Sequence, residues 1–102
     1  MIPTLLEHRQ ELQAICRRFH VARLDIFGSA AEHDTDREAA DLDFLVEFER
    51  SEFMSLADQY FGLLRALQEL FDRDVDLLTP RSLRNPHFIQ EVERTKRRVY
   101  AA

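Results

Sequence analysis

The chain has few of the residues that mark disulfide-rich or low-complexity proteins. Its 102 residues include one cysteine, two glycines, three prolines and no tryptophan. A single thiol, Cys16, cannot form a disulfide within the chain, so nothing indicates an oxidising compartment. So little glycine and proline also excludes collagen-like and Pro/Gly-rich disordered sequences. We therefore expect one compact, helix-rich domain over residues 1–102, with Cys16 as a buried free thiol.

Long apolar runs and a surplus of positive charge are absent as well. No segment approaches the roughly 20 apolar residues that a membrane-spanning helix needs, and no signal-peptide pattern is seen. The formal net charge is -5, whereas DNA-binding surfaces need clustered Lys and Arg. The sequence therefore predicts a cytoplasmic protein with no DNA partner and no membrane partner.

Apolar residues make up 45% of the chain and recur with two different periods. Alternation with period two predicts three strands, at 21–27, 41–48 and 74–78. Spacing of three and four predicts three helices, at 3–18, 51–71 and 86–99. We expect Ser51 to cap the second helix and Pro86 to begin the third. These elements predict an α+β fold, in which a small mixed sheet of three or four strands packs on helices on one face.

The strand predicted at 41–48 has a polar face that begins with two carboxylates. Successive side chains of a strand point to opposite faces, so Asp41 and Asp43 point the same way while the apolar residues between them face the core. Two adjacent carboxylates repel each other unless water, a proton or a cation separates them. An Asp-x-Asp pair is about as often a solvated strand end, so the pair alone leaves both interpretations open.

A third carboxylate comes from the strand predicted at 74–78, whose apolar residues alternate with Asp74 and Asp76. If the two strands pair over one core, Asp74 or Asp76 joins Asp41 and Asp43. Three converging carboxylates suit a hard divalent cation, and Mg²⁺ typically takes one or two carboxylates together with substrate phosphates. The pattern therefore predicts a cation site on the polar face of the sheet.

Gly28 and Ser29 directly follow the strand predicted at 21–27. Glycine permits a tight bend and a close approach of the backbone to a ligand. N–H groups at a helix start, beside a serine hydroxyl, can hold phosphate oxygens. Most Gly-Ser pairs are ordinary turns, so it is the position after a strand that favours a phosphate site here.

Three motifs taken together resemble those of the minimal nucleotidyltransferases, a small branch of the DNA polymerase β-like superfamily. They are Phe27-Gly28-Ser29, Asp41-Leu42-Asp43 and Val75-Asp76-Leu77. The resemblance covers nearly the whole chain. Members of this family are typically antitoxins of toxin–antitoxin modules whose toxin is a helical HEPN ribonuclease, and some transfer AMP from ATP to a tyrosine of that toxin.

The resemblance implies a role for each matching residue. Gly28 and Ser29 correspond to the turn that holds the nucleotide phosphates. Asp41, Asp43 and Asp76 correspond to the catalytic carboxylates that bind Mg²⁺, and the third of them helps to activate the acceptor hydroxyl. The implied substrate is ATP, the implied reaction is an in-line attack at phosphorus, and the implied partner is a HEPN-type toxin. The protein would form a hetero-oligomer with that toxin, or a homodimer alone.

The chain departs from the family pattern after the Gly-Ser turn. Family members usually have Arg-Gly where this sequence has Glu32 and His33. An anion in place of a cation should weaken nucleotide binding unless Arg37 or the basic cluster at 94–98 compensates. Two functions therefore stay open: transfer of AMP to a hydroxyl of the toxin, with tyrosine as the expected acceptor, and neutralisation of the toxin by binding alone.

Overall fold

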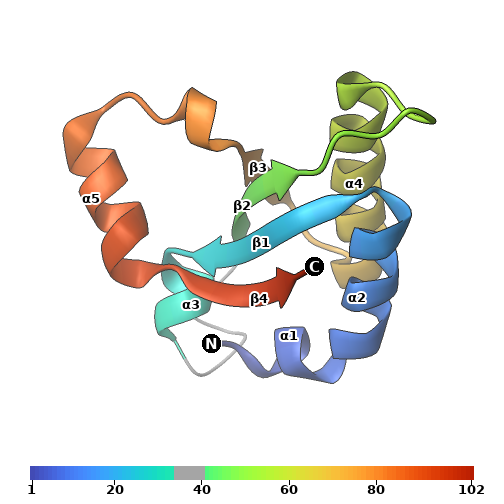
Figure 1. The fold of residues 1–102 in the computed structure, drawn as a ribbon. Helices are drawn as coiled ribbons and strands as arrows, with labels where there is room; N and C mark the ends of the chain where they lie inside the picture. The colour runs from blue at the N-terminus through green and yellow to red at the C-terminus, as the bar shows by residue number, and fades with distance from the viewer. Residues whose placement is uncertain (34–40) are drawn as a thin grey trace.

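The structure, a computed structural model, describes residues 1–33 and 41–102. Its centre is a four-stranded sheet in the order β3-β2-β1-β4 (Figure 1). The strands are β1 Val21–Phe27, β2 Leu42–Phe48, β3 Val75–Leu78 and β4 Arg97–Ala101. β1 pairs antiparallel with β2 and β4, whereas β2 and β3 pair in parallel. The expected α+β fold with a small mixed sheet is confirmed.

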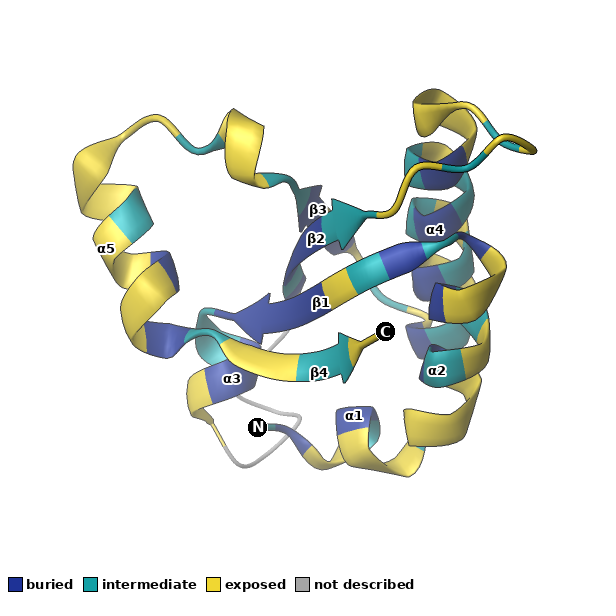
Figure 2. Ribbon diagram, in the orientation of Figure 1, coloured by how far each residue is buried: buried dark blue, intermediate teal, exposed yellow. Residues whose placement is uncertain are grey.

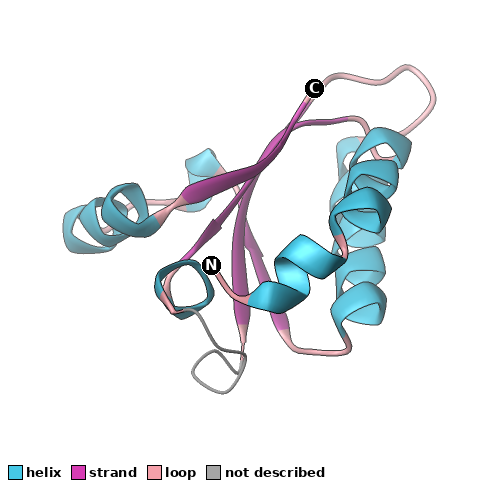
Figure 3. Ribbon diagram, turned by 90° about the horizontal axis from the view of Figure 1, so that it is seen from below, coloured by secondary structure: helices cyan, strands magenta, loops and turns pink. Residues whose placement is uncertain are grey.

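One face of the sheet carries the main hydrophobic core. The helices α1 Pro3–Glu7, α2 Arg9–Arg18 and α4 Leu56–Phe71 lie on this side (Figures 1 and 3). Figure 2 shows that the buried residues lie along the central strands and on the inward sides of these helices. Fully buried side chains of this core include Leu12, Cys16, Leu24, Ile26, Leu42, Phe44, Val46, Leu63 and Leu67. Because burial disfavours the thiolate, the pKa of the Cys16 thiol is raised to about 12, as expected for an inert buried thiol.

The helix predicted at 3–18 is divided at His8. The backbone of His8 has φ -103° and ψ 22°, and its ring nitrogen Nδ1 lies 2.9 Å from the carbonyl oxygen of Thr4. A side chain that bonds back to the preceding turn competes with the regular helical pattern.

None of the described helices is long and apolar enough to cross a membrane.

The central helix begins later than the sequence predicts. Its cap is Ser55, whose hydroxyl accepts a hydrogen bond from the amide of Asp58 at 3.1 Å, so α4 begins at Leu56 and the prediction of Ser51 is wrong. The hydroxyl of Ser51 instead accepts from the amide of Phe53 in a preceding turn. Ser55 is followed three residues later by an acidic residue, which favours a helix start, and Ser51 is not.

The last helix, α5 Pro86–Thr95, begins at proline as predicted but ends four residues before Val99. The next residues form β4, which pairs with the outer edge of β1. Arg98 of β4 places its Nε atom 2.9 Å from a carboxylate oxygen of Asp25, a β1 residue that is 5% exposed. A buried carboxylate needs such a partner, and this favours a strand over a longer helix.

α5 lies on the side of the sheet opposite α2 and α4 (Figure 3). A second, small group of buried side chains forms here from Phe27, Leu45 and Val92, with Leu78 and Leu83 packed against it. Leu45 belongs to the strand face expected to be polar, yet it is buried because α5 covers it. The segment from β3 through α5 therefore covers part of this face and leaves its carboxylate end uncovered.

Candidate functional site

The strand pairing brings two of the predicted carboxylates together. β2 and β3 run in parallel with Asp43 opposite Asp76, so both side chains point to the face away from the main core. A side-chain hydrogen bond joins the two carboxyl groups. The pKa of Asp43 is raised to about 6, first by burial and then by the negative charges of Asp76 and Asp41. Asp43, beside Asp76, thus keeps its proton to a higher pH than an ordinary aspartate.

Asp74, the alternative to Asp76, has a different place in the sheet. Its backbone carbonyl accepts a hydrogen bond from the amide of Leu42 at 3.1 Å. This bond lies just before the paired residues of β2 and β3, in which Asp43 is opposite Asp76. Asp76 is therefore the carboxylate beside Asp43, as the Val-Asp-Leu motif suggested. Asp41 is exposed and immediately precedes β2. Its charge acts on Asp43, since it contributes to the raised pKa of that residue.

The three carboxylates do not form a closed metal cage. Within residues 1–33 and 41–102, no three His, Cys, Asp or Glu side chains are arranged to hold a metal ion. Asp43 and Asp76 contact each other, and Asp41 stays in solvent. Mg²⁺ needs only one or two carboxylates when substrate phosphates complete its shell. A hydrogen-bonded carboxylate pair therefore fits a cation that arrives together with a nucleotide.

The Gly28 turn lies directly against Asp43. Phe27 pairs with Asp43 in the β1–β2 register, which places the next residue, Gly28, beside the carboxylate. Gly28 has φ +71°, and a Cβ atom built there would lie 2.9 Å from Oδ2 of Asp43. Both the left-handed backbone and the close carboxylate require a residue without a side chain. The predicted site residues Gly28 and Asp43 are thus in mutual contact.

Ser29 is the first residue of the short helix α3 Ser29–Glu32. Its neighbours Ala30 and Ala31 are buried against the sheet, while Ser29 is partly exposed. The carbonyl of Gly28 accepts hydrogen bonds from the amides of Ala31 and Glu32, and these bonds fix the turn. Ser29 therefore lies at the surface, one residue from the contact between Gly28 and Asp43.

The carboxylate of Glu32 forms an ion pair with Arg94. Arg94 of α5 places Nη1 2.9 Å from a carboxylate oxygen of Glu32 and Nε 3.0 Å from one of Glu91. These two carboxylates raise the pKa of the Arg94 guanidinium further above its usual range. One member of the predicted basic cluster thus compensates the charge of Glu32. Arg37, the other candidate for this role, lies outside the described residues.

A pocket of about 470 Å³ opens beside the carboxylate pair. Its lining consists of Phe27, Asp43, Asp76, Leu78, Ser82, Leu83 and Phe88. In the sequence, the apolar side chains of Leu83 and Phe88 are typical of residues that pack a helix against a core. Their role as a pocket wall depends on where α5 lies relative to the sheet, and no local sequence signal indicates that.

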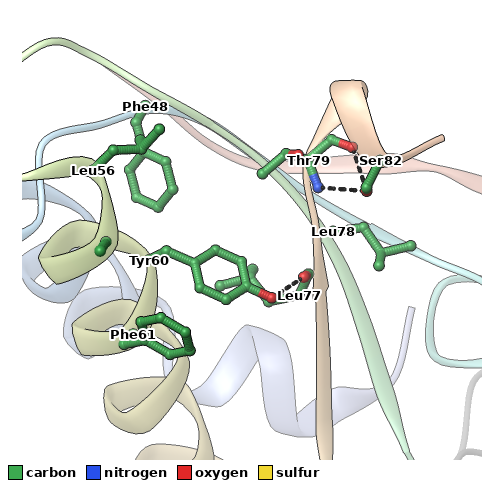
Figure 4. A pocket seen from close by; sticks show the side chains of 9 residues that line it. Phe48, Leu56, Tyr60, Phe61, Leu77, Leu78, Thr79 and Ser82 are labelled. Carbon is green, nitrogen blue, oxygen red and sulfur yellow. Dashed lines mark hydrogen bonds between the residues drawn. The ribbon is translucent and has the colours of Figure 1, made fainter.

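A second pocket, of about 510 Å³, lies between α4 and β3 on the main-core side of the sheet (Figure 4). Tyr60 reaches from α4 and donates a hydrogen bond from its hydroxyl to the carbonyl of Leu77 at 2.6 Å. The described lining of this pocket includes Phe48, Leu56 and Phe61 and contains no acidic or basic side chain. Its described lining therefore lacks the charged side chains that the carboxylate site has.

Comparison with known proteins identifies the family of this chain. Residues 8–99 match the model of the nucleotidyltransferase domain. A Methanocaldococcus jannaschii protein, provisionally named a protein adenylyltransferase, is 32% identical over 89 residues, which is 87% of this chain and 84% of that protein. A second protein of the same organism and the same provisional name is 28% identical over 85 residues, 83% of each chain.

Solved structures agree with this assignment. A structure described as a minimal nucleotidyltransferase superimposes with a TM-score of 0.68 and 32% identity, covering 92% of this chain and 91% of that one. The complex of a tri-AMPylated HEPN toxin of Shewanella oneidensis with its MNT antitoxin contains the same fold, with a TM-score of 0.63 and 18% identity, over 96% of this chain and 73% of that one. This chain belongs to the nucleotidyltransferase domain family, in its minimal nucleotidyltransferase branch.

Proposed function

We propose that this protein transfers AMP from ATP to a tyrosine hydroxyl of a HEPN-type toxin and thereby acts as its antitoxin. The observation that carries the proposal is the contact of the Gly28 turn with Asp43, which is itself hydrogen-bonded to Asp76. If the Gly28 turn receives phosphate, that phosphate would lie beside the carboxylate pair. The relatives named as protein adenylyltransferases and the AMPylated toxin complex support this reaction for the present chain.

The reaction would be an in-line displacement at the α-phosphorus of ATP. The acceptor oxygen forms a bond to the α-phosphorus, the bond from that phosphorus to the bridging oxygen of the β-phosphate breaks, and pyrophosphate leaves. The hydroxyl proton passes to the carboxylate of Asp76, which lies opposite Asp43 and is exposed at the sheet surface. Catalysis then rests mainly on positioning and on charge neutralisation.

Asp41, Asp43 and Asp76 are the residues that would hold Mg²⁺ in this site. Their carboxylate oxygens are the ligands that this hard cation prefers. When bound, Mg²⁺ would neutralise phosphate charge and the repulsion from Asp76 and Asp41 that, after burial, raises the pKa of Asp43. Gly28 keeps the carboxylate accessible because no side chain fills the space beside it.

Gly28 and Ser29 are proposed to receive the phosphates of ATP. A complex of a toxin–antitoxin pair with AMP-PNP, which contains a chain of the same fold at 20% identity and a TM-score of 0.65, supports nucleotide as a ligand of such a domain. The Arg94–Glu32 ion pair lies at the end of α3, three residues beyond Ser29. Arg94 thus reduces the repulsion that Glu32 would otherwise exert on a triphosphate.

A second candidate function is neutralisation of the toxin by binding alone. One observation favours it: Glu32 stands where family members usually have Arg. In either case the protein would work in the cytoplasm as a hetero-oligomer with its toxin. The two functions differ in whether neutralisation of the toxin requires the carboxylates of Asp41, Asp43 and Asp76.

Intact-mass spectrometry of the neighbouring-gene HEPN protein distinguishes them. That protein is incubated with this one, Mg²⁺ and ATP, beside the Asp41→Asn/Asp43→Asn double variant. We expect one or more added AMP masses with the unmutated protein only. Glu47→Gln is a matched control, because Glu47 lies on the same face of β2 but pairs with Arg23 at 2.6 Å. A stable complex without any mass change would favour binding alone.

A further inference from the structure

We propose that the pocket bounded by Phe27, Leu83 and Phe88 is the acceptor site of this protein, and that it holds the phenol ring of the tyrosine with its hydroxyl at Asp43 and Asp76. The inference rests on the proposed AMP transfer and deepens it. It assigns the ring a binding site on this chain, whereas the proposed function alone requires only a hydroxyl at the carboxylates. We name Phe27, Leu83 and Phe88 the acceptor wall.

The pocket has two sides of different origin. The sheet contributes Phe27 from β1, Asp43 from β2, and Asp76 and Leu78 from β3. The segment after β3 and the start of α5 contribute Ser82, Leu83 and Phe88. A volume of about 470 Å³ between these sides is ample for one aromatic ring. A ring that enters here has carboxylate oxygens and apolar carbon within the same pocket.

The polar groups of the pocket match a ligand with one polar atom. Apart from the two carboxylates, the only polar side chain in its described lining is Ser82. The hydroxyl of Ser82 donates to the carbonyl of Thr79 at 2.7 Å and accepts from the amide of Thr79 at 3.2 Å. It therefore has little capacity left for a ligand.

A phenol fits this arrangement better than a purine. The ring nitrogens and amino group of adenine are distributed around its edge, and each would lose a hydrogen bond to water without finding a partner on the acceptor wall. A phenol has a single oxygen, which the carboxylates can receive, and its remaining surface is apolar. Serine and threonine acceptors would leave the acceptor wall uncovered. The chemistry of the pocket thus favours tyrosine.

Phe88 is held in place and remains accessible. The side-chain oxygen of Asn85 caps α5 by accepting from the amides of His87 and Phe88, so Phe88 is fixed in the first turn. Val92, four residues later and on the same helix face, is buried against the sheet. Phe88 meets Phe27 edge to face, with ring centroids 6.0 Å apart, yet is 41% exposed. One edge of this aromatic pair is thus available to a third ring.

The kinetic test compares Phe88→Ala with Phe61→Ala. Phe61 is a matched control because it is an exposed phenylalanine, 64% accessible, that lines the pocket between α4 and β3 instead. Rates are measured against the concentration of the HEPN toxin at saturating ATP, and against ATP at saturating toxin. We expect Phe88→Ala to raise the toxin KM by about 10-fold and to leave the ATP KM unchanged, as expected for loss of a ring contact. Phe88→Tyr should restore most of the toxin affinity.

Two results would overturn the proposal. A rise of the ATP KM in Phe88→Ala, with an unchanged toxin KM, would show that the pocket holds the nucleobase. Unchanged values for both substrates would show that the acceptor wall contacts neither. Circular dichroism of each variant checks that the fold is kept.

A binding measurement separates this proposal from the transfer reaction itself. In the isolated protein, p-cresol is titrated as a phenol probe and adenosine as a purine probe, while the resonances of Leu83 and Phe88 are followed by NMR. Saturable shifts with p-cresol at both residues, absent with adenosine, are expected even if no AMP is transferred, and the shift at Phe88 should be lost in Leu83→Ala. If p-cresol shifts neither resonance, the acceptor-site proposal is wrong regardless of activity.

Discussion

The amide of Gly28 donates a hydrogen bond to the hydroxyl of Thr95 at 3.0 Å, which joins the turn beside Asp43 to the last turn of α5. Thr95 is 3% exposed, and its hydroxyl in turn donates to the carbonyl of Glu91 at 2.8 Å. The hydroxyl is therefore fully used. The position of α5, and with it that of the acceptor wall, is tied to the same glycine that admits the carboxylate.

Thr95→Val should destabilise the protein because it leaves the amide of Gly28 without its acceptor. We expect a loss of about 1–2 kcal/mol in the free energy of unfolding, the usual cost of an unsatisfied buried donor. Urea denaturation measures it, and Thr95→Ser, which keeps the hydroxyl, should lose less. Equal stability of Thr95→Val and the unmutated protein would show that water replaces the hydroxyl.

Gly28→Ala should damage both the fold and the site. The backbone at φ +71° disfavours any side chain, and the new Cβ atom would lie 2.9 Å from Oδ2 of Asp43. We expect a loss of about 1–3 kcal/mol of stability, typical of a residue forced into a sparsely populated backbone region. Ser29→Ala is the matched control and should unfold at nearly the urea concentration of the unmutated protein. A Gly28→Ala variant of unchanged stability and activity would contradict this role.

The Asp43–Asp76 pair should make the metal-free protein less stable as pH rises. The folded pKa of Asp43, about 6, lies above the unfolded value near 4, so the folded state binds the extra proton between them. The contribution of this proton to the free energy of unfolding is therefore fully present below about pH 4 and is lost as pH rises through about 6. Because solvent screens a half-buried group, we expect a change on the order of 1 kcal/mol.

Thermal unfolding across this pH range, in the presence of a chelator, measures the slope. Asp43→Asn should remove it, because the amide does not titrate. The titration midpoint of Asp43 can be measured from its carboxyl ¹³C NMR signal, and added Mg²⁺ with ATP should lower it. A midpoint near 4 in the free protein would show that burial and the neighbouring carboxylates do not raise the pKa of Asp43.

Arg94→Ala should weaken ATP binding although Arg94 need not touch the nucleotide. Removal of the guanidinium leaves Glu32 uncompensated at the end of α3. We expect a several-fold higher ATP KM that shrinks at high salt, because the site is exposed and salt screens surface charges. Glu32→Gln combined with Arg94→Ala should restore the KM. An unchanged ATP KM in Arg94→Ala would show that Glu32 does not influence the phosphates.

Gly62→Ala should destabilise the protein despite the higher helix propensity of alanine. Gly62 lies inside α4, where a Cβ atom would clash with Cε1 of Phe19, at the end of α2. Alanine usually stabilises a helix interior by up to about 1 kcal/mol, but overpacking of this kind typically costs about 1–3 kcal/mol. Chemical denaturation should show a net loss, and Phe19→Leu in the same chain should recover part of it. A net gain would mean that the ring moves freely.

Strands and carboxylates were predictable because their signal is local. Alternation with period two located β1, β2 and β3 to within one residue, and the same alternation placed Asp43 and Asp76 on one face. β4 was missed because Arg97–Ala101 lacks this alternation, and its pairing depends on the distant partner Asp25. The position of a strand that completes an edge is decided by tertiary contacts.

The environment of the site was not predictable from local pattern. Glu32 reads as one of several solvated acidic residues until Arg94, 62 positions later, is seen to pair with it. Phe88 reads as a core residue because helical spacing cannot tell which parts of α5 extend beyond the sheet. The wall of the pocket and the charge balance near α3 both depend on where α5 lies.

β1 is an inner strand of the sheet: β2, the next strand in the sequence, lies on one side of it and β4, the last strand, lies on the other. Its full pairing requires residues 97–101, and the bond from Gly28 to Thr95 spans 67 positions. The proposed phosphate turn at Gly28 and the acceptor wall are therefore both held by the part of the chain after β3. A chain that stopped before Thr95 would lose the anchor of the Gly28 turn together with β4, so the two proposed sites would fail together rather than one after the other.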